Sequence, residues 1–256
     1  MNPITSEHLD IEPMSGQFPD DLCLIIGAGH FGKRAARILK ETSDSPILII
    51  DKDKDRIESI EPLHTEKIVS DGVNFLVKNI QSLNPSSVIV PAIPVHLASE
   101  WLKIFLEEHG WEIQPIRVPE EIIQLLPHTW QGTGGTLLIS YTDFLCPDDC
   151  PEPSDHCPMT GETRSEPLHE LLNRLSVPLH QIHVIRSRQL APGLGGYKAE
   201  DLTNLYSKVS QGEGKWLVGT ACKCHGALTG VEVMKGEVGR RKAEVGRGMA
   251  ERRGER

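Results

Sequence analysis

Short apolar runs alternate with longer amphipathic segments over the first half of the chain. The runs predict strands at 22–26, 47–50, 66–72, 87–90 and 112–118. The segments between them have the spacing of helices, at 30–41, 51–62, 73–80, 94–108 and 120–126. Strands that alternate with helices in this way are typical of a doubly wound parallel sheet. We therefore predict an α/β protein that begins with a Rossmann domain over residues 21–127.

The first apolar run leads directly into Gly27-x-Gly29-x-x-Gly32, and a helical pattern begins inside this motif. In such a context the first glycine allows a tight turn, and the second lets the backbone approach a pyrophosphate. The third lets helix and strand pack closely, and the free N–H groups of the first helical turn face the anion. The sequence therefore predicts a nucleotide site, with a loop of small residues beside a buried strand as the alternative.

Two acids follow apolar runs at positions that suit such a site. Asp51 ends the second run, roughly 20 residues beyond the glycines, where a carboxylate that binds ribose is expected. Asp71 ends the third run, and the carboxyl ends of parallel strands meet at one edge of the sheet. Because Asp51 would repel a 2′-phosphate, NAD(H) is favoured over NADP. Lys52 and Arg56 weaken that inference, and ATP or ADP would use the same contacts.

Composition places the chain among ordinary globular proteins with an acidic balance. The formal net charge is −9, which argues against a nucleic-acid partner. Residues 1–20 are polar, without an apolar signal segment, and we expect a disordered arm there. With no apolar run long enough to span a membrane, we expect a cytoplasmic protein. Residues 235–256 are rich in charge and glycine, and we expect a disordered tail.

Four stretches together resemble the Trk-type NAD-binding domain, also called the RCK N-terminal domain: IIGAGHFGKRAARIL, ILIIDKDKDRIE, VSDGVNFL and SSVIVPAIPVHLASEWLKIFLEE. The resemblance covers about residues 21–125. That family regulates potassium uptake systems and channels by binding nicotinamide or adenine nucleotides. The resemblance therefore implies a nucleotide ligand, a membrane transporter as partner and a homo-oligomer. We recognise neither the second RCK ligand-binding domain nor a channel segment downstream.

The same resemblance implies roles for individual residues. Asp51 would bind the adenosine ribose, and Asp71 with Gly72 would lie near the adenine. The phosphates would be held by Gly27, Gly29, His30, Phe31 and Gly32. A weaker resemblance, to precorrin-2 dehydrogenase, an NAD-dependent enzyme of sirohaem synthesis, extends over residues 126–140.

The second half of the chain predicts a smaller α/β module over residues 128–234. Its patterns favour strands at 136–141, 182–185 and 216–219, and helices at 168–175 and 201–209. A glycine-rich stretch at 191–197 fits no named phosphate-binding motif, so we interpret it as an ordinary loop that leads into a helix. The C-terminal half resembles no family that we recognise.

Five of the six cysteines lie in two short segments of this module. They are Cys146, Cys150, Cys157, Cys222 and Cys224. Zinc takes four nitrogen or sulfur ligands and iron–sulfur clusters usually take four thiolates, so this grouping predicts a Zn or Fe–S site. The spacing matches no common metal motif, and reactive or buried thiols, such as a redox switch, are the alternative. Cys23, inside the first strand, is interpreted as a core residue.

Together these features predict an NAD(H)-binding regulatory or redox-sensing protein with a cysteine-ligated metal or Fe–S site in its second half. The alternative is an NAD-dependent oxidoreductase whose second half holds a substrate or passes electrons to a redox partner protein. Whether the protein is an enzyme stays open at this point, because no side chain stands out in the sequence as a proton donor.

Overall fold

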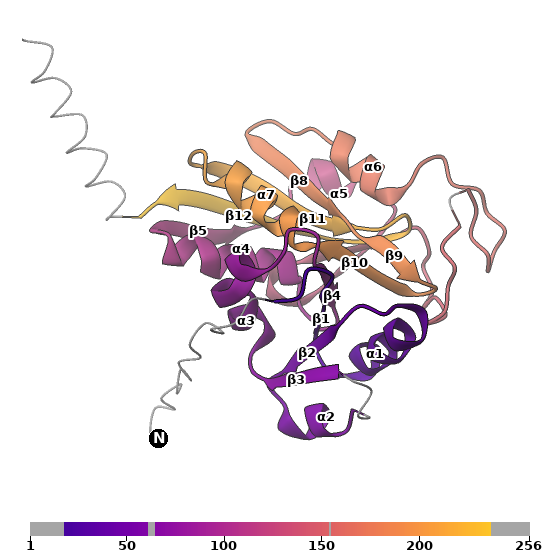
Figure 1. The fold of residues 1–256 in the computed structure, drawn as a ribbon. Coiled ribbons are helices and arrows are strands. Elements are labelled where there is room, and N and C mark those ends of the chain that lie inside the picture. Colours follow the sequence, from indigo (N-terminus) through magenta and orange to yellow (C-terminus); the bar gives the residue numbers. More distant parts are fainter. Residues whose placement is uncertain (1–17, 61–64, 154, 237–256) are drawn as a thin grey trace, which may run out of the picture.

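The computed structural model describes residues 18–60, 65–153 and 155–236, and it contains two β-sheets (Figure 1). Most of the arm expected at 1–20 and of the tail expected at 235–256 lies outside the described residues. In the part of the chain that is described, no helix has the length and apolar content needed to cross a membrane.

The first sheet is mixed and mainly parallel, with the strand order β3-β2-β1-β4-β10-β9. Its parallel strands are β1 (Cys23–Ile26), β2 (Ile47–Asp51), β3 (Thr65–Val69) and β4 (Val88–Pro91). An antiparallel pair completes it, formed by β9 (Arg188–Ala191) and β10 (Leu194–Lys198). Every residue of β1 and β2 is buried, as expected for parallel strands covered on both faces.

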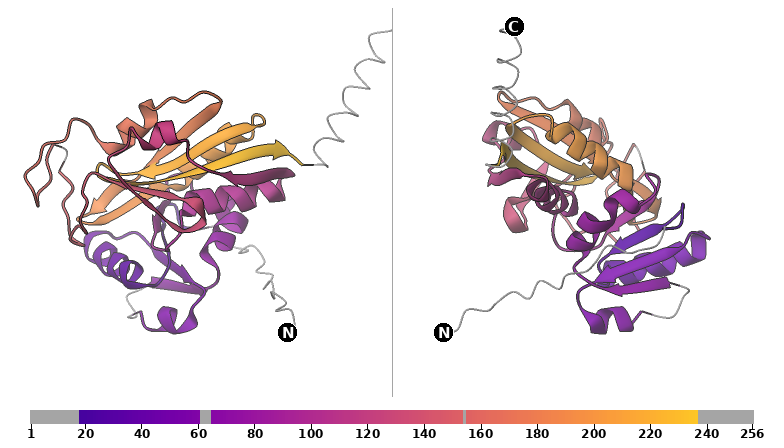
Figure 2. Two further views of the ribbon diagram at one scale, coloured as in Figure 1. Left: turned by 180° about the vertical axis from the view of Figure 1, so that it is seen from behind. Right: turned by 60° about the vertical axis from the view of Figure 1, so that its left-hand side comes forward.

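Helices cover both faces of this sheet. On one face lie α1 (His30–Thr42) and the short α2 (Lys54–Glu58), which share a core with β1 and β2. On the other face lie α3 (Gly72–Asn79), a 3-10 turn at Ile80–Ser82, α4 (Leu97–Glu108) and α7 (Ala199–Val209). Two helices of this second group, α4 and α7, also pack against strands of the second sheet and therefore lie between the two sheets (Figure 2).

The second sheet is mostly antiparallel and has the order β6-β7-β12-β11-β8, with β5 also paired to β12. Its strands are β5 (Trp111–Ile116), β6 (His128–Gln131), β7 (Leu137–Ser140), β8 (His180–Arg186), β11 (Gly214–Ala221) and β12 (His225–Lys235). A 3-10 turn at Thr133–Gly135 separates β6 from β7. The outer face of the sheet is covered by α5 (Glu120–Ile123) and α6 (Leu168–Arg174).

The prediction of a fifth parallel strand at 112–118 was wrong. That segment forms β5, which pairs antiparallel with β12 in the second sheet. The place beside β4 is taken by β10, which runs antiparallel to it. A Cβ atom at Gly196 would lie 2.9 Å from the carbonyl oxygen of Ile89, so a glycine is what lets β10 come this close to β4.

The glycine-rich stretch at 191–197 is not a loop that leads into a helix. It contains the turn and second strand of the β9–β10 hairpin, and α7 starts only after it. Residues from the second half of the chain thus complete the first sheet. The domain boundary between 127 and 128 stays a prediction.

Candidate functional site

The glycine motif forms the turn between β1 and α1 (Figure 1). Gly27 has a φ of +107°, and a Cβ atom on it would lie 2.4 Å from the carbonyl oxygen of Ala92. At Gly32 a Cβ atom would lie 1.8 Å from the carbonyl oxygen of Gly27. At Gly29, by contrast, it would meet no atom of the described chain within 4 Å. The turn is therefore closed in by backbone at its two ends and open at its middle glycine.

Asp51 is directly involved in holding this turn. It is 8% exposed at the end of β2, and its Oδ2 accepts a hydrogen bond of 2.6 Å from the backbone N–H of Ala28. Its Oδ1 accepts another of 2.9 Å from the N–H of Asp53. The backbone N–H of Gly27 donates to the carbonyl of Ile50 at 2.7 Å. The carboxylate and the turn thus meet at the carboxyl ends of β1 and β2, whereas the neighbouring Lys52 is exposed.

Asp71 and Gly72 begin α3, at the end of the segment that follows β3. The Oδ1 of Asp71 accepts hydrogen bonds from the N–H groups of Val73 at 3.1 Å and Asn74 at 3.0 Å, so Asp71 is the N-cap of this helix. A Cβ atom on Gly72 would lie 2.4 Å from the Cγ2 of Ile26. Both residues therefore have a structural role, and their position near an adenine stays a prediction.

His30 and Phe31 are the exposed side chains at the start of α1. The Phe31 side chain is 57% exposed and lies edge-on to the His30 ring. The Nε2 of His30 lies 2.7 Å from the Oδ2 of Asp148, a residue between Cys146 and Cys150. The cysteine-bearing segment of the second half therefore contacts the predicted phosphate cradle directly. Nothing in the sequence indicates this contact, because it joins residues 118 positions apart.

In the Cys222–His225 turn, where β11 leads into β12, the sulfur of Cys222 is hydrogen-bonded to the backbone of the turn itself. The Sγ of Cys222 accepts hydrogen bonds from the N–H groups of Cys224 at 3.4 Å and His225 at 3.2 Å. Burial raises the pKa of the Cys222 thiol, and it raises that of Cys224 to about 12. These two thiols are therefore protonated at neutral pH.

The other cysteine segment is joined to this turn by Glu152. The Oε1 of Glu152 accepts hydrogen bonds from the N–H groups of Lys223 at 2.6 Å and Cys224 at 3.2 Å.

The third cysteine of the segment, Cys157, has a thiol whose pKa burial alone would raise. Hydrogen bonds from the backbone N–H groups of Thr160 and Met159 instead hold it below its ordinary value.

The predicted Zn or Fe–S site is not supported by the structure. Within the described ranges, no group of three or more His, Cys, Asp or Glu side chains is placed to hold a metal ion. Each of the six cysteines is a free thiol.

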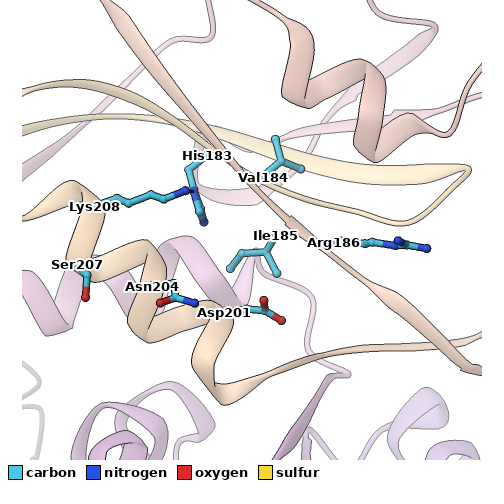
Figure 3. A pocket seen from close by; sticks show the side chains of 8 residues that line it. All are labelled: His183, Val184, Ile185, Arg186, Asp201, Asn204, Ser207 and Lys208. Atoms are coloured by element: carbon cyan, nitrogen blue, oxygen red, sulfur yellow. Dashed lines mark hydrogen bonds between the residues drawn. The ribbon is translucent and has the colours of Figure 1, made fainter. Parts of the chain in front are cut away.

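A separate cavity of about 330 Å³ lies between β8 and α7 (Figure 3). At one end of it, the Nζ of Lys208 lies 3.2 Å from the Nδ1 of His183, and burial lowers the pKa of His183 to about 4. The cavity is lined by His183, Val184, Ile185, Arg186, Asp201, Asn204, Ser207 and Lys208. Sequence reasoning assigned no role to His183, because a single histidine in a strand gives no signal of a cavity.

Comparisons with known proteins match two parts of the chain to different families. Residues 23–89 match the TrkA-N domain, which confirms the resemblance stated from the sequence. Residues 95–234 match the family AF_1314_C, described as "Uncharacterized protein, C-terminal domain". An "Uncharacterized protein" of Archaeoglobus fulgidus is 31% identical over 222 residues, which cover 82% of this chain and 98% of the relative.

Among solved structures, a likeness was found to a Thermoplasma acidophilum protein described as a "putative methyltransferase". The two chains are 15% identical, and the match covers 41% of this chain and 61% of that chain. Its TM-score of 0.25 is too low to indicate a shared fold. The family is shown instead by the matched C-terminal region and the archaeal relative. The chain belongs to the family of the AF_1314_C C-terminal domain, with a TrkA-N domain ahead of it.

Proposed function

We propose that this protein is an NAD(H)-binding regulatory protein, in which the TrkA-N domain binds the nucleotide and the C-terminal domain responds to it. One observation carries the proposal. Gly27 and Gly32 are closed in by backbone, whereas Gly29 between them faces open space among the described residues. This is the arrangement that a phosphate needs to approach backbone N–H groups at the start of a helix.

The buried carboxylate at the end of β2 supports NAD(H) as the ligand. Asp51 is held at the edge of the turn by its hydrogen bonds to Ala28 and Asp53. A carboxylate in this place accepts hydrogen bonds from the ribose hydroxyls of NAD and repels the 2′-phosphate of NADP. The family resemblance also includes adenine nucleotides as ligands, so ATP and ADP are the competitors to test.

Regulation is favoured over the alternative, hydride transfer to a substrate, by the position of the cavity between β8 and α7. The helix α7 starts where the N–H of Ala199 donates to the carbonyl of Ser87, which lies just before the amino end of β4. The glycine turn lies at the carboxyl ends of the parallel strands. A substrate in the cavity would not meet a nicotinamide bound at that turn, whereas His30 and Asp148 join the turn directly to the C-terminal domain.

The proposal is tested by calorimetric titration of the full chain with NAD⁺, NADH, NADP⁺ and ATP. We expect NAD⁺ or NADH to bind, and we expect Gly29→Asp to weaken binding at least about tenfold, because it places a negative charge in the phosphate cradle. The matched control is Gly212→Asp, since Gly212 also faces open space and lies in the turn between α7 and β11.

The free energy of unfolding is expected to be similar in both variants, because neither new side chain meets described atoms within 4 Å of its Cβ. Equal nucleotide affinity in Gly29→Asp and Gly212→Asp would overturn the proposed site. A protein that binds none of the four nucleotides would overturn the proposed function as a whole.

A further inference from the structure

An acid of the C-terminal domain lies against the predicted phosphate cradle. The carboxylate of Asp148 lies 2.7 Å from the Nε2 of His30, the first residue of α1. The amino end of a helix carries a partial positive charge and attracts anions. Asp148 therefore lies at the same end of α1 that the phosphates of a nucleotide would use.

Asp148 is kept at this position by the turn of the β9–β10 hairpin. Gly193 in that turn has a φ of +67°, and a Cβ atom on it would lie 1.6 Å from the carbonyl oxygen of Asp148. The N–H of Gly193 donates to the carbonyl of Cys150 at 2.8 Å, and the Nε2 of Gln189 donates to the same carbonyl at 3.0 Å. The segment that carries Asp148 is thus seated on the hairpin, and only glycine fits at the point of closest approach.

The hairpin is in turn tied to α1. The Nη2 of Arg34 donates to the carbonyl of Pro192 at 2.9 Å. The glycine turn, the hairpin and the segment 146–152 therefore form one connected set of contacts. Its far end is Glu152, which holds the Cys222–His225 turn.

A nucleotide phosphate and the Asp148 carboxylate carry the same sign of charge and would share His30 and the amino end of α1. Two anions this close repel, and both cannot hold the same position. We propose that Asp148 is an internal partner of His30 at the edge of the phosphate cradle, and that a nucleotide displaces it from this residue. The displacement releases the segment 146–152 from the hairpin and so passes the signal of nucleotide binding to the cysteine turns. This inference rests on the proposed function.

The experiment compares wild type with Asp148→Asn and with a matched control, Asp149→Asn. Asp149 is the adjacent exposed acid, so its loss changes the net charge equally while keeping the His30–Asp148 pair. Affinities for NAD⁺ and ATP are measured by calorimetry. Hydrogen exchange is followed in peptides that contain Gly193, whose amide reports on its bond to Cys150.

We expect Asp148→Asn to tighten NAD⁺ binding roughly two- to fivefold, the range of a single exposed charge contact, and to tighten ATP binding by a larger factor, because ATP carries more negative charge. Asp149→Asn should change both by less. In wild type, saturating NAD⁺ should speed exchange at Gly193. In Asp148→Asn without nucleotide, exchange at Gly193 should already be faster than in wild type.

Several results would overturn the inference. If NAD⁺ binds but leaves exchange at Gly193 unchanged in wild type, the segment is not displaced and the proposed function still stands. If Asp148→Asn and Asp149→Asn have equal affinities, Asp148 does not compete for the cradle. If wild type and Asp148→Asn both fail to bind any nucleotide, the inference falls together with the proposed function.

Discussion

The glycine turn at 27–32 and the two cysteine segments at 146–157 and 222–225 differ in how far their surroundings can be predicted from the sequence around each motif. The glycine turn contacts its own motif, from Gly32 to Gly27, and the ends of the neighbouring parallel strands, at Asp51 and Ala92. These contacts follow from the strand–turn–helix context. The cysteine segments acquire their surroundings from distant parts of the chain, through His30, Gly193 and Lys223. A short motif therefore indicates its local geometry well and its long-range neighbours poorly.

The largest effect that we expect distinguishes two glycines of the same turn. Gly32→Ala places a Cβ atom 1.8 Å from the carbonyl oxygen of Gly27, so β1 and α1 must separate. We expect a loss of at least about 3 kcal/mol in the free energy of unfolding, measured by urea denaturation. Gly29→Ala, with open space around the new atom, should lose less than about 1 kcal/mol. Similar losses in the two variants would contradict the close packing at Gly32.

A second prediction concerns His96, which joins the start of α4 to two strands of the second sheet, β11 and β12. His96, which precedes α4, is buried, and its Nδ1 and Nε2 lie 2.8 Å from the Oγ1 of Thr229 and 3.2 Å from the Oγ1 of Thr220. Burial lowers its pKa to about 4. The unfolded chain therefore binds a proton below about pH 6.5 that the folded chain binds only near pH 4, and stability falls as the pH falls through this window.

The expected loss from this group is about 3 kcal/mol between pH 7 and pH 4, measured as the free energy of unfolding against pH. His96→Gln should remove this part of the slope. Burial also lowers the pKa of His183 and of His225. Wild type and His96→Gln should therefore both keep the part of the pH dependence of stability that these two histidines cause. Parallel curves for wild type and His96→Gln would show that His96 does not control the acid side of the profile.

The smallest effect is expected at the cysteine turn. Glu152→Ala removes the oxygen that accepts from the Lys223 and Cys224 N–H groups, and of these two Cys224 keeps a second acceptor, the Sγ of Cys222. We expect a loss of about 2 kcal/mol of stability. Glu152→Gln keeps an acceptor oxygen and should lose less. Thermal unfolding of the two variants is the measurement, and an equal loss in both would show that the carboxylate charge, rather than the hydrogen-bond acceptor, holds the turn.

The sequence allowed much of the first sheet to be predicted, because β1, β2 and β4 lie in apolar runs and a helical pattern follows each of them. It did not allow β6, β9, β10 and β12 to be recognised. Glycines interrupt the patterns of β10 and β12, whereas β6 and β9 are only four residues long and contain several polar residues. Several of these glycines permit close contacts between strands, as at Gly230, where a Cβ atom would lie 2.6 Å from the carbonyl oxygen of Ile116. The site followed the same rule: the glycine turn formed at the predicted residues, whereas the contact of His30 with Asp148 depended on the assembled fold.

The pairing of β12 has a consequence for synthesis of the protein. β12 is the last strand described, yet it pairs with β5, β7 and β11. On the ribosome, β1 to β4 emerge early and already contain the parallel pairs of the first sheet, whereas β5 and β7 must wait for β12 before they pair with it. The nascent chain would therefore expose apolar residues of β5 and β7 until β12 has been made, and this interval is when we expect it to depend most on chaperones.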